Sequence, residues 1–474
     1  MKLETPQAIV AAAAAPVPEM NPRTRMLLQA PIASTLVKLA WPNLLVMLAQ
    51  ASTGLIETWW VSHLGTDALT GMAVVFPGFM MMQMLSAGAM GGGISSAIAR
   101  ALGARRTDDA EALVMHATLI NILLGLIGSA IFLIWGRAIY TAMGVSGGAL
   151  DAAMQYSNVV FGGSVLVWLM NGFASIIRGT GNMLVPSLSI CIGVVLLIPL
   201  SPLLIFGWGP IPALGIAGGG WAVVLSTFTV GAVLAGYILS GRCIVHFKLA
   251  RLRWDLSADI LRVGAIAAVI SLQTSFTVLL TTALVGGFAG GDAVAGFGTG
   301  VRLEYLMVPL AFGFGGPLVA LVGTNIGAGQ EQRALRAALI GGGMVFVITE
   351  TVGLAAAIWP AAWLGLFGSD PQMIETGSAY LRIVGPAYGF FGLGLSLYFA
   401  SQGAGKMLYP LLAGVLRLLI SIGGGWLALR LTGSLTWLFA CLTFALVVYG
   451  TIIVTAVASG TWFKTNRSDG DVIT

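Results

Sequence analysis

Charged residues are scarce in this chain. Asp, Glu, Lys and Arg together make up 9% of its 474 residues, whereas hydrophobic residues make up 57%. A soluble domain needs a much higher density of charge on its surface, so this composition excludes an ordinary water-soluble protein. The mean hydropathy of +0.94 points the same way. We therefore expect an integral membrane protein.

Cysteine and histidine are also rare, with three residues of each. Cys191, Cys243 and Cys441 lie far apart and form neither a disulfide framework nor a metal-binding spacing. No histidine pair has the spacing of metal ligands. Paired aspartates, or a nucleophile beside its base at one membrane depth, are not evident either. A membrane-embedded enzyme is thus the less favoured class, and we expect no metal and no cofactor.

The chain contains an internal repeat with an interval of about 224 residues. The segment RGTGNMLVP at 178–186 returns as QGAGKMLYP at 402–410. The same interval places Gly103 on Gly327 and Tyr156 on Tyr380. Two homologous halves within a membrane are typical of secondary transporters, whose substrate site lies between the repeats. A receptor would also fit the composition, but the duplication favours transport.

Twelve segments are long and apolar enough to cross a hydrocarbon core of about 30 Å. We place them near 34–62, 68–100, 111–135, 152–177, 183–206, 213–240, 260–286, 293–326, 334–360, 375–401, 407–429 and 434–460. Six spans per half make the repeat parallel. The predicted fold is therefore all-α, with two homologous six-helix lobes. Its parts are a disordered tail (1–32), a first lobe (33–240), a linker (241–259), a second lobe (260–460) and a second tail (461–474).

The distribution of Lys and Arg indicates the orientation. With the amino terminus inside, most of the 23 basic residues fall on one side, and only Arg137 and Arg430 lie clearly on the other. Basic residues favour the cytoplasmic side, so we expect both termini and the linker there. The net charge of +5 then reflects membrane topology and not nucleic-acid binding.

Three carboxylates fall inside predicted spans and away from the span ends: Glu57, Glu304 and Glu350. An ionised carboxylate at that depth costs about 2.5–3.5 kcal/mol, so each needs a partner, a wet cavity or a proton. Glu57 continues a helical stripe of polar and small residues that also contains Gln50, Thr53 and Gly54. We interpret Glu57 as a proton-responsive group of the first lobe. The alternative is a glutamate that a neighbouring donor satisfies permanently.

Glu304 has two open interpretations, a structural ion pair with a basic residue such as Arg417 and a direct role in transport. The repeat places Glu57 opposite Thr281 or Thr282, so the acid is present in one half only. The remaining polar candidates for the substrate or ion cavity are Glu350, the seventh-span stripe Gln273, Thr277 and Thr281, and the interior residues Gln83 and Asn171. Polar residues of this kind also serve in helix packing.

Four segments carry a resemblance to a known family. IETWWVSHLG at 56–65, IARALGA at 98–104, RGTG at 178–181 and NIGAG at 325–329 resemble the multidrug and toxic compound extrusion (MATE) family over essentially the whole chain beyond residue 32. The resemblance implies two lobes in a V shape that export cationic or polyaromatic organic compounds in exchange for protons or sodium ions. In that pattern the first-span acid is usually aspartate, and here it is Glu57.

The chain departs from the family pattern at other ion-coupling positions. Ser201 stands where the DinF-like branch carries aspartate, while Gln273 and Phe391 match acids of NorM-like members. A single acid favours protons over sodium, although Thr53, Ser201 and backbone carbonyls offer oxygen ligands for sodium. The resemblance further implies a monomer in the bacterial inner membrane that handles small organic substrates. A lipid-linked oligosaccharide flippase of the same superfamily is the alternative, and Arg302 and Arg417 are its only candidate pyrophosphate ligands.

Overall fold

The computed structural model describes residues 20–463, and for residues 48, 51, 52 and 292 it describes the backbone alone. Within this range the chain is helical, and its extended structure is limited to an isolated bridge between Trp208 and Ile211. In a helix the backbone N–H and C=O groups pair with each other, whereas lipid tails offer them no hydrogen-bond partner. An apolar chain of this kind therefore crosses the membrane as helices.

The helices of the first half are α3 (Ile32–Ser62), α4 (Thr66–Gln83), η1 (Met84–Met90), α5 (Gly91–Gly103), α6 (Thr107–Ala142), α7 (Gly147–Gly162), α8 (Ser164–Gly179), α9 (Leu184–Phe206) and α10 (Ile216–Leu239). The element η1 is a π-helical segment that joins α4 to α5 without a break. Between α7 and α8 the chain bends by 44°.

The helices of the second half are α11 (Trp254–Gly327), α12 (Glu331–Ile358), α13 (Pro360–Leu364), α14 (Pro371–Val384), η2 (Gly385–Ala387), α15 (Tyr388–Ala404), α16 (Leu408–Leu418), η3 (Leu419–Gly424), α17 (Gly425–Thr432) and α18 (Leu435–Ala458). The long element α11 holds two spans, which Gly290 divides with a φ of 81°. Because a side chain strains a positive φ, glycine suits this turn.

All twelve predicted spans correspond to helical segments of the described chain. Ten of them are long and apolar enough to cross a membrane, and the bent pair α7 and α8 makes an eleventh. The remaining span is α3, which has 31 residues and an apolar first part, Ile32–Met47. The predicted fold class is therefore confirmed.

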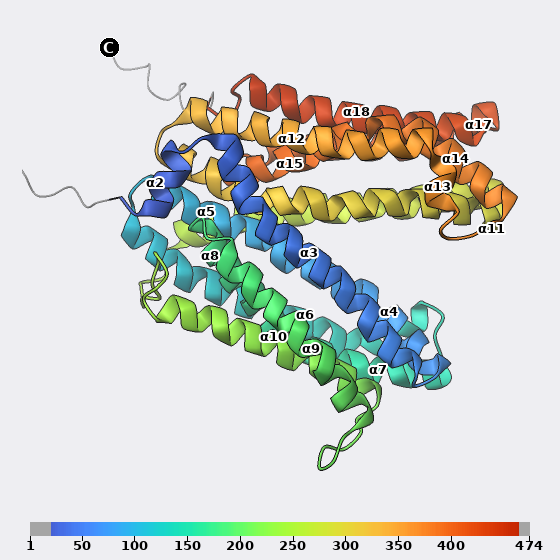
Figure 1. Ribbon diagram of the computed structural model, residues 1–474, viewed down its shortest axis with the longest axis horizontal. Coiled ribbons are helices and arrows are strands. Elements are labelled where there is room, and N and C mark those ends of the chain that lie inside the picture. The colour runs from blue at the N-terminus through green and yellow to red at the C-terminus, as the bar shows by residue number, and fades with distance from the viewer. Residues whose placement is uncertain (1–19, 464–474) are drawn as a thin grey trace, which may run out of the picture.

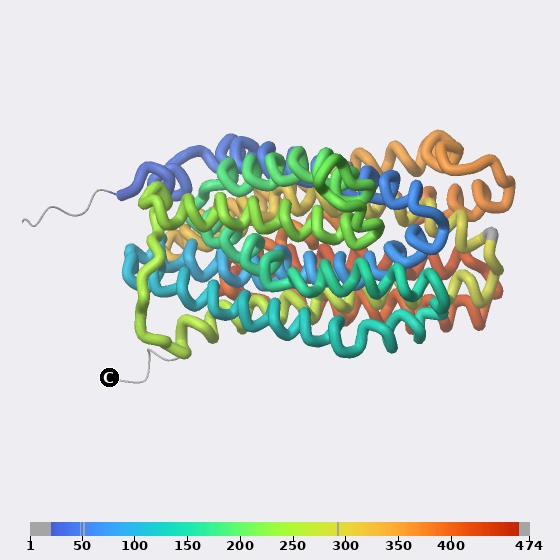
Figure 2. The backbone as a smooth tube through the Cα atoms, turned by 90° about the horizontal axis from the view of Figure 1, so that it is seen from below, coloured from blue at the N-terminus to red at the C-terminus, as the bar shows by residue number. Residues whose placement is uncertain are grey.

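The two halves form separate groups of helices. Figure 1 shows them together at the end that carries α2 (Pro22–Gln29) and α5, and diverging toward the opposite end. The helices run along the long axis of the molecule, as Figure 2 shows from another side. The result is a V of two six-helix lobes, which we call the N lobe and the C lobe.

The lobes contact each other where α5 crosses the end of α11. A methyl group on Gly103 would collide with the carbonyl oxygen of Thr324, and one on Gly327 would collide with that of Arg100. These two contacts are related by the internal repeat, because each residue pair maps onto the other after about 224 residues. Small residues let helix backbones approach closely in membranes. The two glycines thus place the interlobe contact near the axis that relates the halves.

The amino-terminal tail differs from its prediction. Residues 1–19 lie outside the described residues, but Pro22–Gln29 form helix α2, which the prediction assigned to a disordered tail. Asn21 caps this helix by accepting a hydrogen bond from the Arg23 backbone N–H. Leu27 is 1% exposed and packs into a core shared with the C lobe. Burial of this leucine is a physical reason for the order, and the sequence pattern of so short a helix did not reveal it.

Side-chain amide and guanidinium groups of the C lobe also fix α2. Asn325 Nδ2 donates to the Leu27 carbonyl over 3.1 Å, and the guanidinium of Arg333 donates to the carbonyls of Leu27 and Ala30. On the other side, the Arg23 guanidinium donates to the Tyr237 hydroxyl of α10 in the N lobe. Helix α2 therefore bridges the two lobes at the end where they meet. The predicted second tail lies mostly in residues 464–474, which the structure does not describe.

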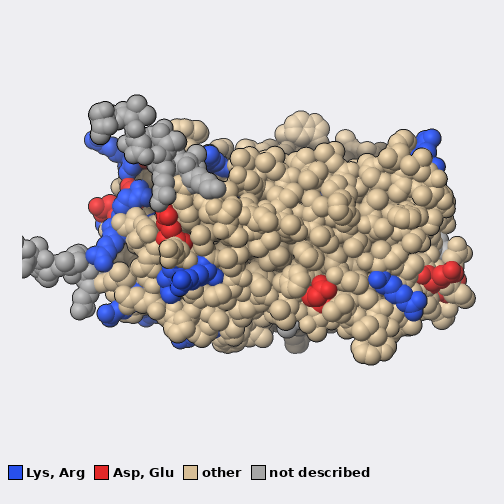
Figure 3. All heavy atoms as spheres, turned by 90° about the horizontal axis from the view of Figure 1, so that it is seen from above, with Lys and Arg blue, Asp and Glu red and all other residues tan. Residues whose placement is uncertain are grey.

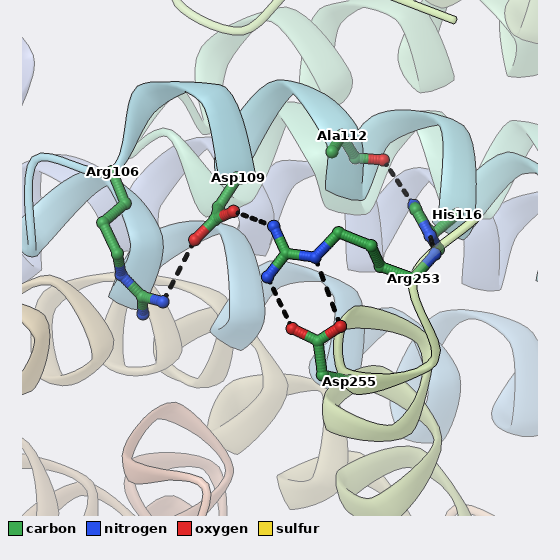
Figure 4. A network of polar contacts seen from close by, with 6 residues as sticks. All are labelled: Arg106, Asp109, Ala112, His116, Arg253 and Asp255. Atoms are coloured by element: carbon green, nitrogen blue, oxygen red, sulfur yellow. Dashed lines mark hydrogen bonds and ion pairs between the residues drawn. The ribbon is translucent and has the colours of Figure 1, made fainter. Parts of the chain in front are cut away.

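The linker between the lobes is irregular until α11 begins at Trp254, so the last residues of the predicted linker (241–259) are helical. It descends the left end of the molecule in Figure 2. Figure 4 shows how Arg253 holds it, with Nη1 at 2.7 Å from Asp109 and Nη2 at 2.6 Å from Asp255. The Arg253 backbone N–H also donates to His116 Nε2, while His116 Nδ1 contacts the Ala112 carbonyl. Both histidine bonds require the neutral tautomer with its proton on Nδ1.

The charged side chains gather where the lobes meet. On the face drawn in Figure 3, Lys and Arg cluster at the left end, and the long apolar body carries few charges. We call this the basic end. Close to it, Glu111 of α6 contacts Lys248 Nζ at 2.5 Å and His246 Nδ1 at 2.9 Å. The hydrogen bond to Glu111 raises the pKa of the Lys248 ammonium.

We expect the replacement Gly103→Ala to destabilise the protein by about 1–3 kcal/mol, because the added methyl group forces α5 away from the Thr324 carbonyl. Gly236→Ala in α10 is the control, since a methyl group there meets nothing within 4 Å. It should leave stability unchanged or raise it by up to about 1 kcal/mol. Thermal unfolding of the purified protein in detergent measures both. Equal effects of the two replacements would contradict a close interlobe crossing.

Candidate functional site

The carboxylate of Glu57 is buried inside the N lobe. It lies in the last part of α3 with 5% of the residue exposed. The side chain lies beside the hydroxyls of Ser201 from α9 and Tyr156 from α7. Among the described residues, Glu57 Oε1 and Ser201 Oγ have no hydrogen-bond partner, and none of the ion pairs includes Glu57. This carboxylate is therefore close to polar neighbours without a fixed counter-charge.

Helix α9 presents Ser201 to this site in an unusual backbone setting. Pro199 and Pro202 both lie inside the helix. Because proline has no N–H, the carbonyl oxygens four residues before each proline receive no normal helical hydrogen bond. The wall of the site opposite Glu57 is thus a proline-interrupted helix. Such a helix has backbone carbonyl oxygens that lack a helical donor.

The rest of the predicted first-span stripe is less deeply placed. Gln50 is exposed, and Thr53 is half-buried with its hydroxyl donating to the Ala49 carbonyl over 3.0 Å. Glu57 is thus the buried end of the stripe. The structure places Glu57 beside Ser201 but not beside Gln50.

Gln83 and Asn171 form a separate polar cluster. Asn171 Nδ2 of α8 donates to Gln83 Oε1 over 2.8 Å and lies 2.8 Å from Ser86 Oγ in η1. Asn171 is 4% exposed. These mutual hydrogen bonds fix the π-helical segment against α8. The pair is therefore well placed for helix packing, and its role as a cavity-lining pair stays a prediction.

The C lobe contains a second, largely covered acid with a different environment. Glu304 Oε1 lies 3.1 Å from Arg417 Nη2, and the two side chains are 13% and 10% exposed. The contact joins α11 to α16. Of the two open interpretations of Glu304, the structure shows the ion pair. A small cavity of about 40 Å³ adjoins this pair, and Thr277, Thr281 and Tyr380 also line it.

The two remaining sequence candidates lie outside both sites. Gln273 is 9% exposed, and its Oε1 has no hydrogen-bond partner among the described residues. It lies one helical turn before Thr277, next to Gly414 of α16. Glu350 of α12 accepts a hydrogen bond of 2.7 Å from the Gly389 backbone N–H, at the start of α15. Its observed contact is that of a helix N-terminal cap.

Sequence reasoning did not assign Tyr156 and Tyr380 to the sites, although it matched them through the repeat. Tyr156 lies beside Glu57 in the N lobe, and the Tyr380 hydroxyl lies 3.5 Å from Glu304 Oε2 in the C lobe. Both tyrosines are at most 5% exposed. A matched, buried tyrosine in each half was the signal that could have identified them.

A salt bridge joins the two lobes at the basic end. Arg100 of α5 makes two hydrogen bonds to the Asp259 carboxylate of α11, of 2.8 and 2.9 Å. The same guanidinium donates to the Gly403 carbonyl over 3.0 Å and to Ser96 Oγ over 2.6 Å. Gln402 also crosses between the lobes, where its Nε2 donates to the Gly88 carbonyl. The described interlobe hydrogen bonds all lie in the half of the molecule nearer the basic end.

These features define a class of protein. Two homologous six-helix lobes with polar groups buried inside them are the architecture of a secondary membrane transporter. A sequence model of the MatE family matches residues 42–203 and again residues 265–427. The chain belongs to the MATE family of multidrug transporters, whose members are transporters and not enzymes.

Individual relatives agree with this assignment. A protein of Shewanella oneidensis named FAD transporter is 30% identical over 381 residues, which cover 79% of this chain and 82% of the relative. A probable multidrug resistance protein NorM of Thermotoga maritima is 28% identical over 386 residues, or 80% of this chain and 82% of that one. A solved structure described as MATE in the bent conformation superposes with a TM-score of 0.84 at 23% identity, covering 94% of this chain and 99% of that chain. The last likeness concerns the fold alone.

We expect loss of the Arg100–Asp259 pair to loosen the basic end. Replacement Arg100→Gln removes both hydrogen bonds to Asp259 and the hydrogen bond to the Gly403 carbonyl. Because the Asp259 side chain is 46% exposed, the ion pair itself contributes only about 0.5–1 kcal/mol. The population with separated lobes should rise about two- to fivefold. A cysteine placed at Thr324, which is fully buried at the crossing, should then react correspondingly faster with a thiol reagent.

The matched control is Arg137→Gln, which removes an exposed ion pair with Asp151 away from the basic end. Its labelling rate at position 324 should equal that of the parent Thr324→Cys protein. If Arg100→Gln left the rate unchanged as well, the pair would not contribute to closure.

Proposed function

We propose that this MATE transporter exports organic compounds in exchange for protons and that Glu57 is the ion-coupling group. The observation that carries the proposal is the contrast between its burial and its lack of a counter-charge. A buried carboxylate without a cationic partner is far more stable in its protonated form than in its ionised form. Its charge state is thus sensitive to the access of water and protons.

The orientation of the protein follows from its basic end. Lys and Arg favour the cytoplasmic side, so we place the basic end, the linker and both ends of the chain there, in the bacterial inner membrane. The closed basic end then corresponds to a state that opens away from the cytoplasm. Arg100, Asp259 and helix α2 are the contacts that separate when the cytoplasmic side opens.

Transport requires that substrate and proton bias the same conformational equilibrium in opposite senses. Facing inward, the protein binds its substrate between the lobes with Glu57 ionised. After the lobes rock outward, protonation of Glu57 changes its contacts with Ser201 and Tyr156 and releases the substrate. The proton enters the cell on the return step. Movement of α3 against α7 and α9 connects the carboxylate to the cleft.

We propose cationic or polyaromatic organic compounds as substrates and a monomer as the working unit. Several relatives are named multidrug resistance or multidrug export proteins, and another is named FAD transporter. A flavin nucleotide is aromatic but anionic. It is therefore the most informative second substrate to test beside a cationic dye.

The geometry argues against the flippase alternative. A pyrophosphate headgroup needs free cations inside the cleft, but Arg417 is paired with Glu304. The guanidinium of Arg302 lies 5.4 Å from the ring of Phe367, a residue in the loop between α13 and α14. Sodium is the second candidate for the coupling ion, because Ser201 and the proline-interrupted helix α9 offer neutral oxygen atoms beside Glu57.

We expect Glu57→Gln to abolish proton-driven export, because a neutral amide cannot bind and release the coupling proton. Efflux of a cationic dye, and separately of FAD, is measured from proteoliposomes under an imposed proton gradient or an imposed sodium gradient. The initial rate of the variant should fall at least about tenfold, to the rate of protein-free vesicles.

Glu375→Gln is the control, since Glu375 is exposed on α14 outside both sites. It should transport like the wild type. Export driven by sodium and lost in Glu57→Gln would replace the proton with sodium. The proposed coupling would be contradicted if neither gradient changed the rate of export. It would also be contradicted if Glu57→Gln still exported the compound.

A further inference from the structure

The buried ion pair of the C lobe has an unusual setting for a structural contact. Arg417 approaches Glu304 to 3.1 Å, and its guanidinium also lies 5.4 Å from the Phe391 ring and 5.5 Å from the Tyr449 ring. Aromatic faces attract cations. A buried ion pair gains little stability over apolar side chains of the same size, because both charges lose their hydration. Stability alone therefore does not explain why this charge pair lies inside the lobe.

Several oxygen-bearing side chains share a cavity with the carboxylate, and apolar side chains such as Val301 and Leu446 complete its lining. The cavity of about 40 Å³ is bordered by Glu304, Tyr380, Ser421, Thr277 and Thr281. One water molecule needs roughly 15 Å³ by this measure, so the cavity accommodates water or a small cation. The Thr277 and Thr281 hydroxyls donate their protons to backbone carbonyls over 2.9 and 2.7 Å. Their lone pairs remain available as acceptors, which is the chemistry that hard cations prefer.

The internal repeat relates this cavity to the Glu57 site. Glu57 and Val61 are both buried, and so are Thr281 and Val285, which lie 224 residues later in the chain. The structure therefore favours Thr281 over Thr282 as the repeat partner of Glu57. Tyr156 beside Glu57 is likewise matched by Tyr380 beside Glu304. The two lobes thus contain corresponding sites, each with a carboxylate, a tyrosine and a hydroxyl-bearing residue. In the C lobe the carboxylate comes from the second span of α11 instead of the first.

The corresponding sites differ in one respect. The residue that matches Arg417 about 224 positions earlier is Gly193 of α9. A side chain at Gly193 would collide with Val230 of α10, so the N lobe has no room for an arginine there. The N lobe leaves its carboxylate without a counter-charge, whereas the C lobe supplies one from its own chain.

We propose that Arg417 is a tethered cation that occupies a latent monovalent-cation site of the C lobe, formed by Glu304, Tyr380, Thr277 and Thr281. The guanidinium takes the place that a proton or a metal ion would otherwise fill. The C lobe therefore exchanges no cation during transport. Removing the arginine exposes the site. The consequence that Glu57 alone carries the coupling rests on the proposed function, but the site itself does not.

The test uses the full-length protein in detergent and measures the midpoint of thermal unfolding. All variants carry Glu57→Gln, so that no cation response arises in the N lobe. Arg417→Met leaves the Glu304 carboxylate without its partner, and the double replacement Glu304→Gln with Arg417→Met removes both charges. One series varies the pH, and another replaces N-methylglucamine by sodium or potassium at constant ionic strength. The two series distinguish a proton from a metal ion.

We expect the midpoint of Arg417→Met to rise by about 2–5 °C with falling pH or with added sodium or potassium. The Glu57→Gln parent and the double replacement should lack this increase. Arg417→Gln, tested in parallel, should respond like Arg417→Met. If the Arg417 variants show no more response than the double replacement, the proposal is wrong, and the ion pair is structural.

Failure to fold is also informative. If the Arg417 variants fold only when a cation is present and the double replacement folds without it, the site is supported. If the Arg417 variants fold under no condition, the carboxylate accepts no mobile cation and the proposal is overturned. Because no transport is measured, these outcomes do not depend on whether Glu57 couples export to protons.

Discussion

The close crossing of α5 and α11 is the contact on which the arrangement of the two lobes depends. Apolar side chains gain little from association in lipid, so helices in membranes associate through close packing and polar contacts. Gly103 and Gly327 allow that packing because each lies against a carbonyl oxygen of the opposite helix. The repeat relates the two contacts to each other, which centres them between the lobes. A contact at this place lets the lobes change their angle without either lobe unfolding.

The other interlobe contacts follow from that crossing. Arg100 lies one turn before Gly103, so its guanidinium reaches Asp259 at the start of α11. Helix α2 adds hydrogen bonds to Asn325 at the end of α11. Because these groups lie at the basic end, water and headgroups can hydrate them when they separate. Within the spans each helix satisfies its own backbone, so the far ends of the lobes can diverge without exposing unpaired groups to lipid.

The architecture was predictable because span length and repeated sequence can be read directly from the chain. The sites were less predictable from the sequence. Burial of Glu57 followed from its position in an apolar span, and Arg417 was one of the partners considered for Glu304. Tyr156 and Ser201, however, reach Glu57 from α7 and α9, and only packing brings these helices to α3. The order of α2 was missed for the same reason, since Leu27 becomes buried only against the C lobe.

The two acids inside the lobes differ in how their charge is compensated. Glu304 is compensated by a guanidinium that cannot lose its proton, and removing the charge of either partner would leave the other charge buried and unpaired. Glu57 has no such compensation, so its most stable state depends on what the surrounding space supplies. A duplicated fold with two equivalent lobes thus contains an electrostatic asymmetry, and a transporter needs only one responsive acid to couple two fluxes.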